Sequence, residues 1–203
     1  MNDLFETEEF HQIYEENEYE LGGQKLKIRE FTFHRLNANQ VWPGNQIFAE
    51  YLLENLAYLK EQKVLELGSA SGILSIFLKK HDIDITASDC PDEEIFENID
   101  YNAKINGIET IPKLPRILYI DLWGEPLNEG LGFTLIIASD ILLYLKSFPS
   151  LIKTLDFLLG ENCKMWLNNR RRIDTEQTFL NMCIEHGFSV KEVFPKIFEI
   201  KKN

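Results

Sequence analysis

The chain has 203 residues, of which 44% are hydrophobic, and this size and composition predict one domain with a core that helices cover on both faces of a sheet. Its formal net charge of −12 argues against nucleic acid as the main partner, because phosphate binding needs clustered Lys and Arg. The acidic N-terminus and the lack of a long apolar run predict a cytoplasmic protein, with the nucleus also open, that does not enter a membrane. Cys90, Cys163 and Cys183 lack disulfide or metal-ligand spacing, so we expect reduced thiols and no metal site.

Two features mark the first forty residues. The first twenty contain eight Asp or Glu and no Lys or Arg, a composition typical of a solvated arm. Gly22-Gly23 then separates two extended segments within residues 20–33, which predicts a β-hairpin. We therefore expect residues 1–40 to form an acidic arm and hairpin extension, followed by the main domain at 41–203.

Strand-like and helix-like segments alternate along the rest of the chain. The expected strands are 63–67, 83–88, 115–120, 133–138 and 163–168, and the expected helices are 45–59, 71–81, 92–106, 148–160 and 174–187. A terminal hairpin is expected around Pro195. This order is typical of βαβ units and predicts a doubly wound α/β fold.

A turn of small residues follows the first of these strands. Gly68, Ala70 and Gly72 let the backbone approach a ligand closely, and Glu66 places a carboxylate at the strand end. A dinucleotide fingerprint would have a third glycine where Ile73 stands, and a pyrophosphate would be repelled by the carboxylate. The turn therefore favours a ligand with a cationic portion, and S-adenosylmethionine meets that requirement.

A second carboxylate, Asp89, ends the next apolar strand about twenty residues later. That separation is the one at which an acidic residue reaches ribose hydroxyls. Cys90 follows it and is placed to line an adenosine site. The alternative is that Gly68 to Gly72 forms an ordinary strand-to-helix turn and that Asp89 caps a helix.

These motifs, in this order, resemble the class I S-adenosylmethionine-dependent methyltransferases, and more narrowly the family 16 group of protein lysine methyltransferases. The pieces that carry the resemblance are Val41-Trp42-Pro43-Gly44, Glu66-Leu-Gly-Ser-Ala-Ser-Gly72, the strand end at Asp89, Asp121-Leu-Trp123-Gly124 and Ala138-Ser-Asp140-Ile-Leu-Leu-Tyr144. The resemblance implies a seven-stranded Rossmann-like sheet with an antiparallel strand near its end. It also implies direct methyl transfer from S-adenosylmethionine without a metal.

The resemblance also implies roles for particular residues. The residues expected at the cofactor are Trp42, Glu66, Gly68, Ser69, Ala70, Gly72, Asp89, Cys90, Asp121, Leu122, Trp123 and Ala138. Asp140 and Tyr144 are the expected catalytic pair, because the family has an Asp-x-x-Tyr/Phe motif beside the transferred methyl group. Here Leu143 occupies the aromatic position and the ring follows at Tyr144. The sequence itself also singles out Asp140, since a charge directly after an apolar strand needs solvent, a partner or a ligand.

The expected function is N-methylation of a lysine in a protein substrate, by a monomer. A small-molecule N- or O-methyltransferase acting on a cationic or amine substrate is the alternative. A noncatalytic binding protein with the same fold also stays open, because of Leu143.

Overall fold

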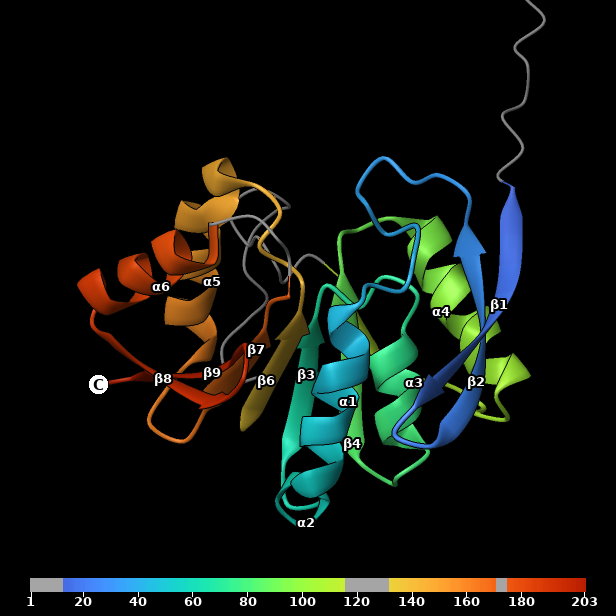
Figure 1. Cartoon of the computed structure of the whole chain (residues 1–203), viewed down its shortest axis with the longest axis horizontal. Coiled ribbons are helices and arrows are strands. Elements are labelled where there is room, and N and C mark those ends of the chain that lie inside the picture. Colours follow the sequence, from blue (N-terminus) through green and yellow to red (C-terminus); the bar gives the residue numbers. More distant parts are fainter. Residues whose placement is uncertain (1–12, 116–131, 171–174) are drawn as a thin grey trace, which may run out of the picture.

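A computed structural model describes residues 13–115, 132–170 and 175–203. Its centre is a seven-stranded sheet in the order β5-β4-β3-β6-β7-β9-β8 (Figure 1). Five strands are parallel to one another: β3 (Lys63–Leu67), β4 (Asp84–Asp89), β5 (Lys113–Pro115), β6 (Leu135–Ser139) and β7 (Lys164–Asn168). β9 (Ile197–Lys202) runs antiparallel to both β7 and β8 (Phe188–Phe194), which confirms the terminal hairpin.

Helices cover both faces of this sheet, as expected. The helices that precede β6 in the sequence are α1 (Gly44–Glu54), α2 (Leu56–Leu59), α3 (Ile73–Lys79) and α4 (Glu93–Ile105). Those that follow β6 are the 3₁₀ helix η1 (Leu145–Ser147), α5 (Phe148–Leu158) and α6 (Thr175–Glu185). Alternate strand residues serve the two faces: Val64 belongs to the core with α1, α3 and α4, whereas Leu65 and Leu67 belong to the core with α5 and α6. The doubly wound α/β fold is therefore confirmed. In the part of the chain that the structure describes, no helix is long and apolar enough to cross a membrane.

The N-terminal extension forms the predicted hairpin, with β1 (Tyr14–Leu21) antiparallel to β2 (Gln24–Phe31). Gly22 and Gly23 have φ values of 53° and 78°, as a two-residue turn with both central residues in the left-handed region requires. The acidic stretch before Gly22 is paired as β1, and residues 14–18 within it are exposed to solvent, as expected of a solvated segment. Its Glu16 and Glu18 lie opposite Arg29 and Lys27, and cross-strand pairs of opposite charge favour the strand. Residues 1–12 lie outside the described part.

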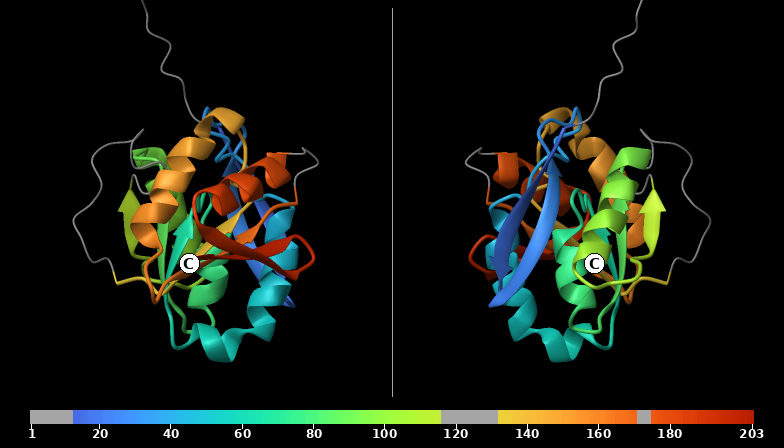
Figure 2. Two further views of the ribbon diagram at one scale, coloured as in Figure 1. Left: turned by 90° about the vertical axis from the view of Figure 1, so that its left-hand side faces the viewer. Right: turned by 90° about the vertical axis from the view of Figure 1, so that its right-hand side faces the viewer.

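The hairpin lies against α4 (Figure 2, right), and asparagine side chains of α4 hold it there. Asn102 accepts a hydrogen bond from the Arg29 amide at 2.7 Å and donates to the Arg29 carbonyl at 3.0 Å. Asn106 makes the same pair of contacts with Lys27. The Asn102 amide also donates to the Ser71 carbonyl at 2.9 Å, so one side chain joins the hairpin to the small-residue turn.

Two predicted elements differ from the structure. The single helix expected over 45–59 is broken at Asn55, whose side chain donates to the Tyr51 carbonyl while its own amide turns to Leu52. Asparagine competes in this way for backbone acceptors, which ends α1 before α2 begins. The strand expected at 115–120 appears as β5 at Lys113–Pro115, and residues 116–131 lie outside the described part.

Candidate active site

A cavity of about 290 Å³ opens at the carboxyl ends of β3, β4 and β6. Ligands of open α/β sheets bind at this edge. Its lining residues are Arg35, Leu36, Asn37, Ala38, Trp42, Gly68, Ala70, Asp89, Ser139, Asp140, Ile141, Leu143, Tyr144 and Lys146. The cavity thus brings together six of the residues singled out from the sequence: Trp42, Gly68, Ala70, Asp89, Asp140 and Tyr144.

The small-residue turn forms the floor of this cavity. Gly68 and Gly72 have φ values of 72° and 78°. Ala70 between them has a φ of 46°, which residues other than glycine rarely adopt. The amides of Gly68 and Ser69 both donate to the Ser88 carbonyl at 2.9 Å, so the turn is tied to β4. A side chain at Gly72 would also press against Ile99 of α4.

Two buried carboxylates lie behind and beside the turn. Asp89 accepts the amides of Ala70 at 2.7 Å and Cys90 at 2.8 Å, and burial raises its pKa despite these bonds. Glu66 is 3% exposed, and its Oε2 accepts the hydroxyl of Ser75. Burial raises the pKa of Glu66 to about 7, because that hydrogen bond offsets only part of the desolvation.

Asp140 stands at the end of β6 and holds two segments of backbone against the cavity. Its Oδ2 accepts the amide of Gly44 at 2.9 Å, and its Oδ1 accepts the amide of Arg170 at 2.8 Å. Gly44 begins α1, so the carboxylate also meets the positive end of that helix. Asp140 is 3% exposed and has a φ of 54°, a strained conformation that its surroundings impose.

The mouth of the cavity is built from two segments distant in sequence. Asn37, in the connection between β2 and α1, donates through its side chain to the hydroxyl of Tyr144, which follows β6. Trp42 closes the connection by donating to the Asn37 carbonyl at 3.3 Å. Glu30 of β2 accepts the Val41 amide and so fixes the approach to Trp42.

Some predicted residues lie away from the cavity lining. Glu66, Ser69, Gly72, Cys90 and Ala138 support it from behind or from the strands, and the structure shows them buried or packed there. Cys90 is 2% exposed, and burial raises the pKa of its thiol. The predicted adenine-site residues Asp121, Leu122 and Trp123 lie outside the described part of the chain.

Apart from Trp42 and Tyr144, the residues at the cavity mouth were not predicted from the sequence. Arg35, Leu36 and Asn37 lie in a connection with no helical or strand periodicity, and Lys146 lies in the short η1. Asn37 has a φ of 58°, a left-handed backbone conformation in which asparagine is enriched. The presence of an asparagine was therefore the one feature of this segment's sequence that indicated a turn.

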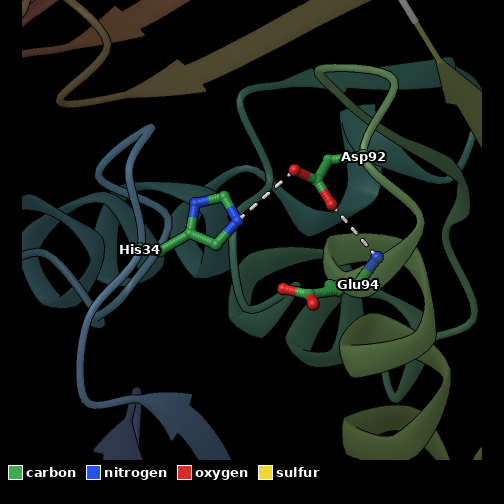
Figure 3. Close-up of side chains that lie close together, drawn as sticks. All are labelled: His34, Asp92 and Glu94. Carbon is green, nitrogen blue, oxygen red and sulfur yellow. Dashed lines mark hydrogen bonds and ion pairs between the residues drawn. The ribbon is translucent and has the colours of Figure 1, made fainter. Parts of the chain in front are cut away.

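His34, Asp92 and Glu94 form a group whose possible ligand atoms lie within 4.8 Å of one another (Figure 3). The Leu36 amide donates to His34 Nδ1 at 3.3 Å, which leaves the ring proton of a neutral His34 on Nε2. That nitrogen faces Asp92 at 3.6 Å, and the Arg35 guanidinium lies 3.2 Å from the same carboxylate oxygen. The arrangement therefore suits ion pairing, which anchors the connection to the start of α4, better than metal ligation.

Comparisons with known proteins agree with this geometry. A sequence model of the family described as "Lysine methyltransferase" matches residues 20–186. Protein N-terminal and lysine N-methyltransferase efm7 of Aspergillus fumigatus is 29% identical, over 88% of this chain and 75% of its own length. Protein N-lysine methyltransferase METTL21A of Danio rerio is 27% identical, over 87% and 80%. Protein-lysine N-methyltransferase EFM3 of Chaetomium thermophilum is 30% identical over 77% of this chain, which spans half of that relative.

Solved structures share the fold. The 16S rRNA N2 G1207 methyltransferase of T. thermophilus, in complex with AdoMet and guanosine, has a TM-score of 0.69 at 15% identity, covering 95% of this chain and 52% of its own. The SAH-bound methyltransferase PaMTH1 of Podospora anserina has a TM-score of 0.55 at 14% identity, covering 85% and 83%. Because the family model covers residues 20–186, the chain belongs to the lysine methyltransferase family and is an S-adenosylmethionine-dependent methyltransferase.

Proposed function

We propose that this protein transfers a methyl group from S-adenosylmethionine to the side-chain amine of a lysine in a protein substrate. The observation that carries the proposal is the cavity between the turn at Gly68 and the carboxylate of Asp140, in a chain of this family. The relatives named for lysine methylation support the choice of acceptor.

The residues on the inner side of the cavity fit the cofactor. Each oxygen of Asp89 accepts one backbone amide, and the Cys90 thiol bonds to the same carboxylate. The carboxylate still lines the cavity, so its remaining acceptor capacity can serve a ribose hydroxyl. The left-handed backbone at Gly68 and Ala70 leaves room for a ligand beside the main chain. The cofactor is cationic and supplies the methyl group. The buried carboxylate of Asp89, and that of Glu66 in its ionised form, give the site the opposite charge.

Asp140 is the residue we assign to the acceptor side. Two of its lone pairs are used by the amides of Gly44 and Arg170, so the remaining two can accept N–H groups from an incoming amine. The amine has a pKa of about 10.4 in water and must lose a proton to expose its lone pair. The apolar wall made by Leu143 and Tyr144 favours the uncharged form by desolvation, and Asp140 orients it.

The proposal is tested by two measurements on the purified protein. Calorimetry should show binding of S-adenosylmethionine and of its demethylated product, and no binding of NAD. Methyl-labelled cofactor, incubated with an undialysed cell extract that keeps its small molecules, should then label lysine in protein. Label only in small molecules would favour the alternative acceptor class, and cofactor binding without any label would favour a noncatalytic binding protein.

Asp140→Asn separates the two roles of this carboxylate. If Asp140 orients the amine, methyl transfer in a single turnover should fall about tenfold or more, which is about 1.36 kcal/mol for each factor of ten, while cofactor affinity changes much less. If Asp140 only holds the backbone of Gly44 and Arg170, the melting temperature should fall and the activity of each folded molecule should survive. Asp84→Asn, at the exposed start of β4, is the matched control. Full activity with unchanged affinity would remove Asp140 from the site.

A further inference from the structure

Exposed apolar side chains gather at the cavity mouth. Among the described residues, seven large hydrophobic side chains are exposed, and four of them lie on the two segments that meet there: Phe33, Leu36, Tyr144 and Leu145. Leu36 and Tyr144 line the cavity directly, and Leu145 is 55% exposed beside them. Apolar side chains concentrated around a site mark a contact surface more often than scattered ones do.

The exposed charges at the same place are positive. Four charged residues line the cavity, and its two carboxylates, Asp89 and Asp140, are buried and bonded to backbone amides. The other two, Arg35 and Lys146, are exposed cations. Arg35 is paired with Asp92, whereas the contact recorded for Lys146 within the described residues is with the ring of Tyr144, at 5.9 Å.

A third cation adjoins the mouth. Arg170 is exposed, and its amide is bonded to Asp140, so it stands next to the acceptor side of the cavity. The chain as a whole has a net charge of −12, so the exposed charges of the cavity lining, Arg35 and Lys146, have the opposite sign to the protein. Exposed charges are screened beyond about 10 Å at 0.1 M salt. A substrate segment bound at the cavity mouth therefore interacts mainly with the nearby cations and not with the net charge of the whole protein.

We propose that the rim, defined as Arg35, Leu36, Tyr144, Leu145 and Lys146, is the docking surface for a protein segment whose target lysine is flanked by acidic and apolar side chains. The proposal rests on the proposed function and names its substrate class. Acidic flanks complement Lys146 and Arg35, and apolar flanks cover Leu36 and Leu145. A basic segment would place like charges against the rim.

The same cations contribute to the chemistry of the acceptor. A lysine that enters past Lys146 meets a like charge and an apolar wall, and both favour loss of its proton. The rim would therefore select the flanks of the acceptor and, at the same time, expose the lone pair on its amine.

The experiment begins by mapping methylated lysines in a dialysed extract with the wild-type protein and labelled S-adenosylmethionine. We expect Asp and Glu to outnumber Lys and Arg around the mapped sites. For one mapped acceptor, Lys146→Glu should lower kcat/KM about three- to tenfold with unchanged cofactor affinity, since it replaces attraction by repulsion at an exposed pair. Lys60→Glu, an exposed lysine after α2 at the opposite end of the sheet, should have no effect (Figure 1).

Two further comparisons make the test specific: an exchange of charges between enzyme and substrate, and two substitutions of exposed apolar residues by serine. Replacing an acidic flank of the acceptor by lysine should harm the wild-type enzyme and restore activity to Lys146→Glu. Leu145→Ser should lower kcat/KM roughly fivefold, and Ile184→Ser on α6, which is 57% exposed, should not.

Three results would overturn the proposal: mapped sites with basic flanks, a Lys146→Glu variant as active as Lys60→Glu, or the absence of rescue by charge reversal. Failure of the proposed function is distinguishable, because it would show as cofactor binding without any labelled lysine.

Discussion

Replacing Glu66 by glutamine should stabilise the protein at pH 8 and change its stability little at pH 5. Glu66 lies in β3 with 3% exposure, and burial raises its pKa from 4.5 to about 7. One pKa unit corresponds to about 1.36 kcal/mol, so ionising this carboxyl in the folded state costs about 3 kcal/mol. Glutamine keeps the size and an oxygen for the hydroxyl of Ser75, but it carries no charge.

The sign follows from proton linkage. Below pH 4.5 the carboxyl is protonated in the folded and unfolded states, and the cost is absent. Between pH 4.5 and about 7 the folded state holds one proton more than the unfolded state, so stability falls as pH rises. Above pH 7 both states are ionised and the full cost of about 3 kcal/mol remains. The difference between Glu66→Gln and wild type should therefore grow from pH 5 to pH 8.

Urea unfolding of the cofactor-free protein at several pH values measures this difference directly. The urea dependence of the unfolding free energy should be unchanged, which would show that the folded states are equally compact. Glu97→Gln, on the exposed side of α4, is the control and should show no such pH dependence. A difference that is constant across pH, or absent at pH 8, would refute the argument that buried charge at Glu66 destabilises the fold.

The same carboxyl links cofactor binding to protons. If the cationic part of S-adenosylmethionine approaches Glu66, binding favours its ionised form and releases a proton near pH 7. Calorimetry in two buffers of different ionisation enthalpy measures that release. Glu66→Gln should abolish it, and an unchanged release would assign the proton to another group.

Three further changes test the framework of the site. Asp89→Ala should weaken cofactor affinity by about 1.5 to 3 kcal/mol, measured by calorimetry, and should also lower stability because the amides of Ala70 and Cys90 lose their acceptor. Unchanged affinity would place the ribose elsewhere. Gly44→Ala should lower stability by about 1 to 3 kcal/mol and reduce turnover, because the added methyl would lie within 3.0 Å of a carboxylate oxygen of Asp140. Asn102→Ala should raise the Kd for the cofactor as well as destabilise the protein, since Asn102 joins Ser71 to the hairpin, and stability loss without a Kd change would limit it to the fold.

The parts of the fold that follow from local pattern were predictable from the sequence. β3 and β6 are short apolar runs, and their flanking glycines and polar residues set their ends within a few residues of the expected positions. The turn at Gly22-Gly23 was predictable for a similar reason, because it needs left-handed backbone at two successive positions. The break at Asn55 was missed, since it depends on one side chain competing for a single carbonyl.

The inner part of the site, at the strand ends, could be predicted from the sequence, whereas most of the cavity mouth could not. Gly68 and Asp89 each lie at the end of a recognisable strand, and parallel strands bring such ends together at one edge. The mouth depends instead on contacts across long stretches of sequence, such as the one between Asn37 and Tyr144. Neither segment has a periodicity that specifies its position, so only the folded structure shows that they meet.

The departure at Leu143 has a structural consequence that favours a working site. The amide of Leu143 bonds to the carbonyl of Ile141 at 2.9 Å, so the chain turns tightly after Asp140 instead of continuing along the strand direction. Leu143 and Tyr144 consequently both line the cavity, although adjacent residues of an extended chain would face opposite sides. Tyr144 is then held at the mouth by Asn37, and its ring and the side chain of Leu143 form one wall. The shift of the aromatic ring by one position therefore leaves the ring in the lining of the cavity.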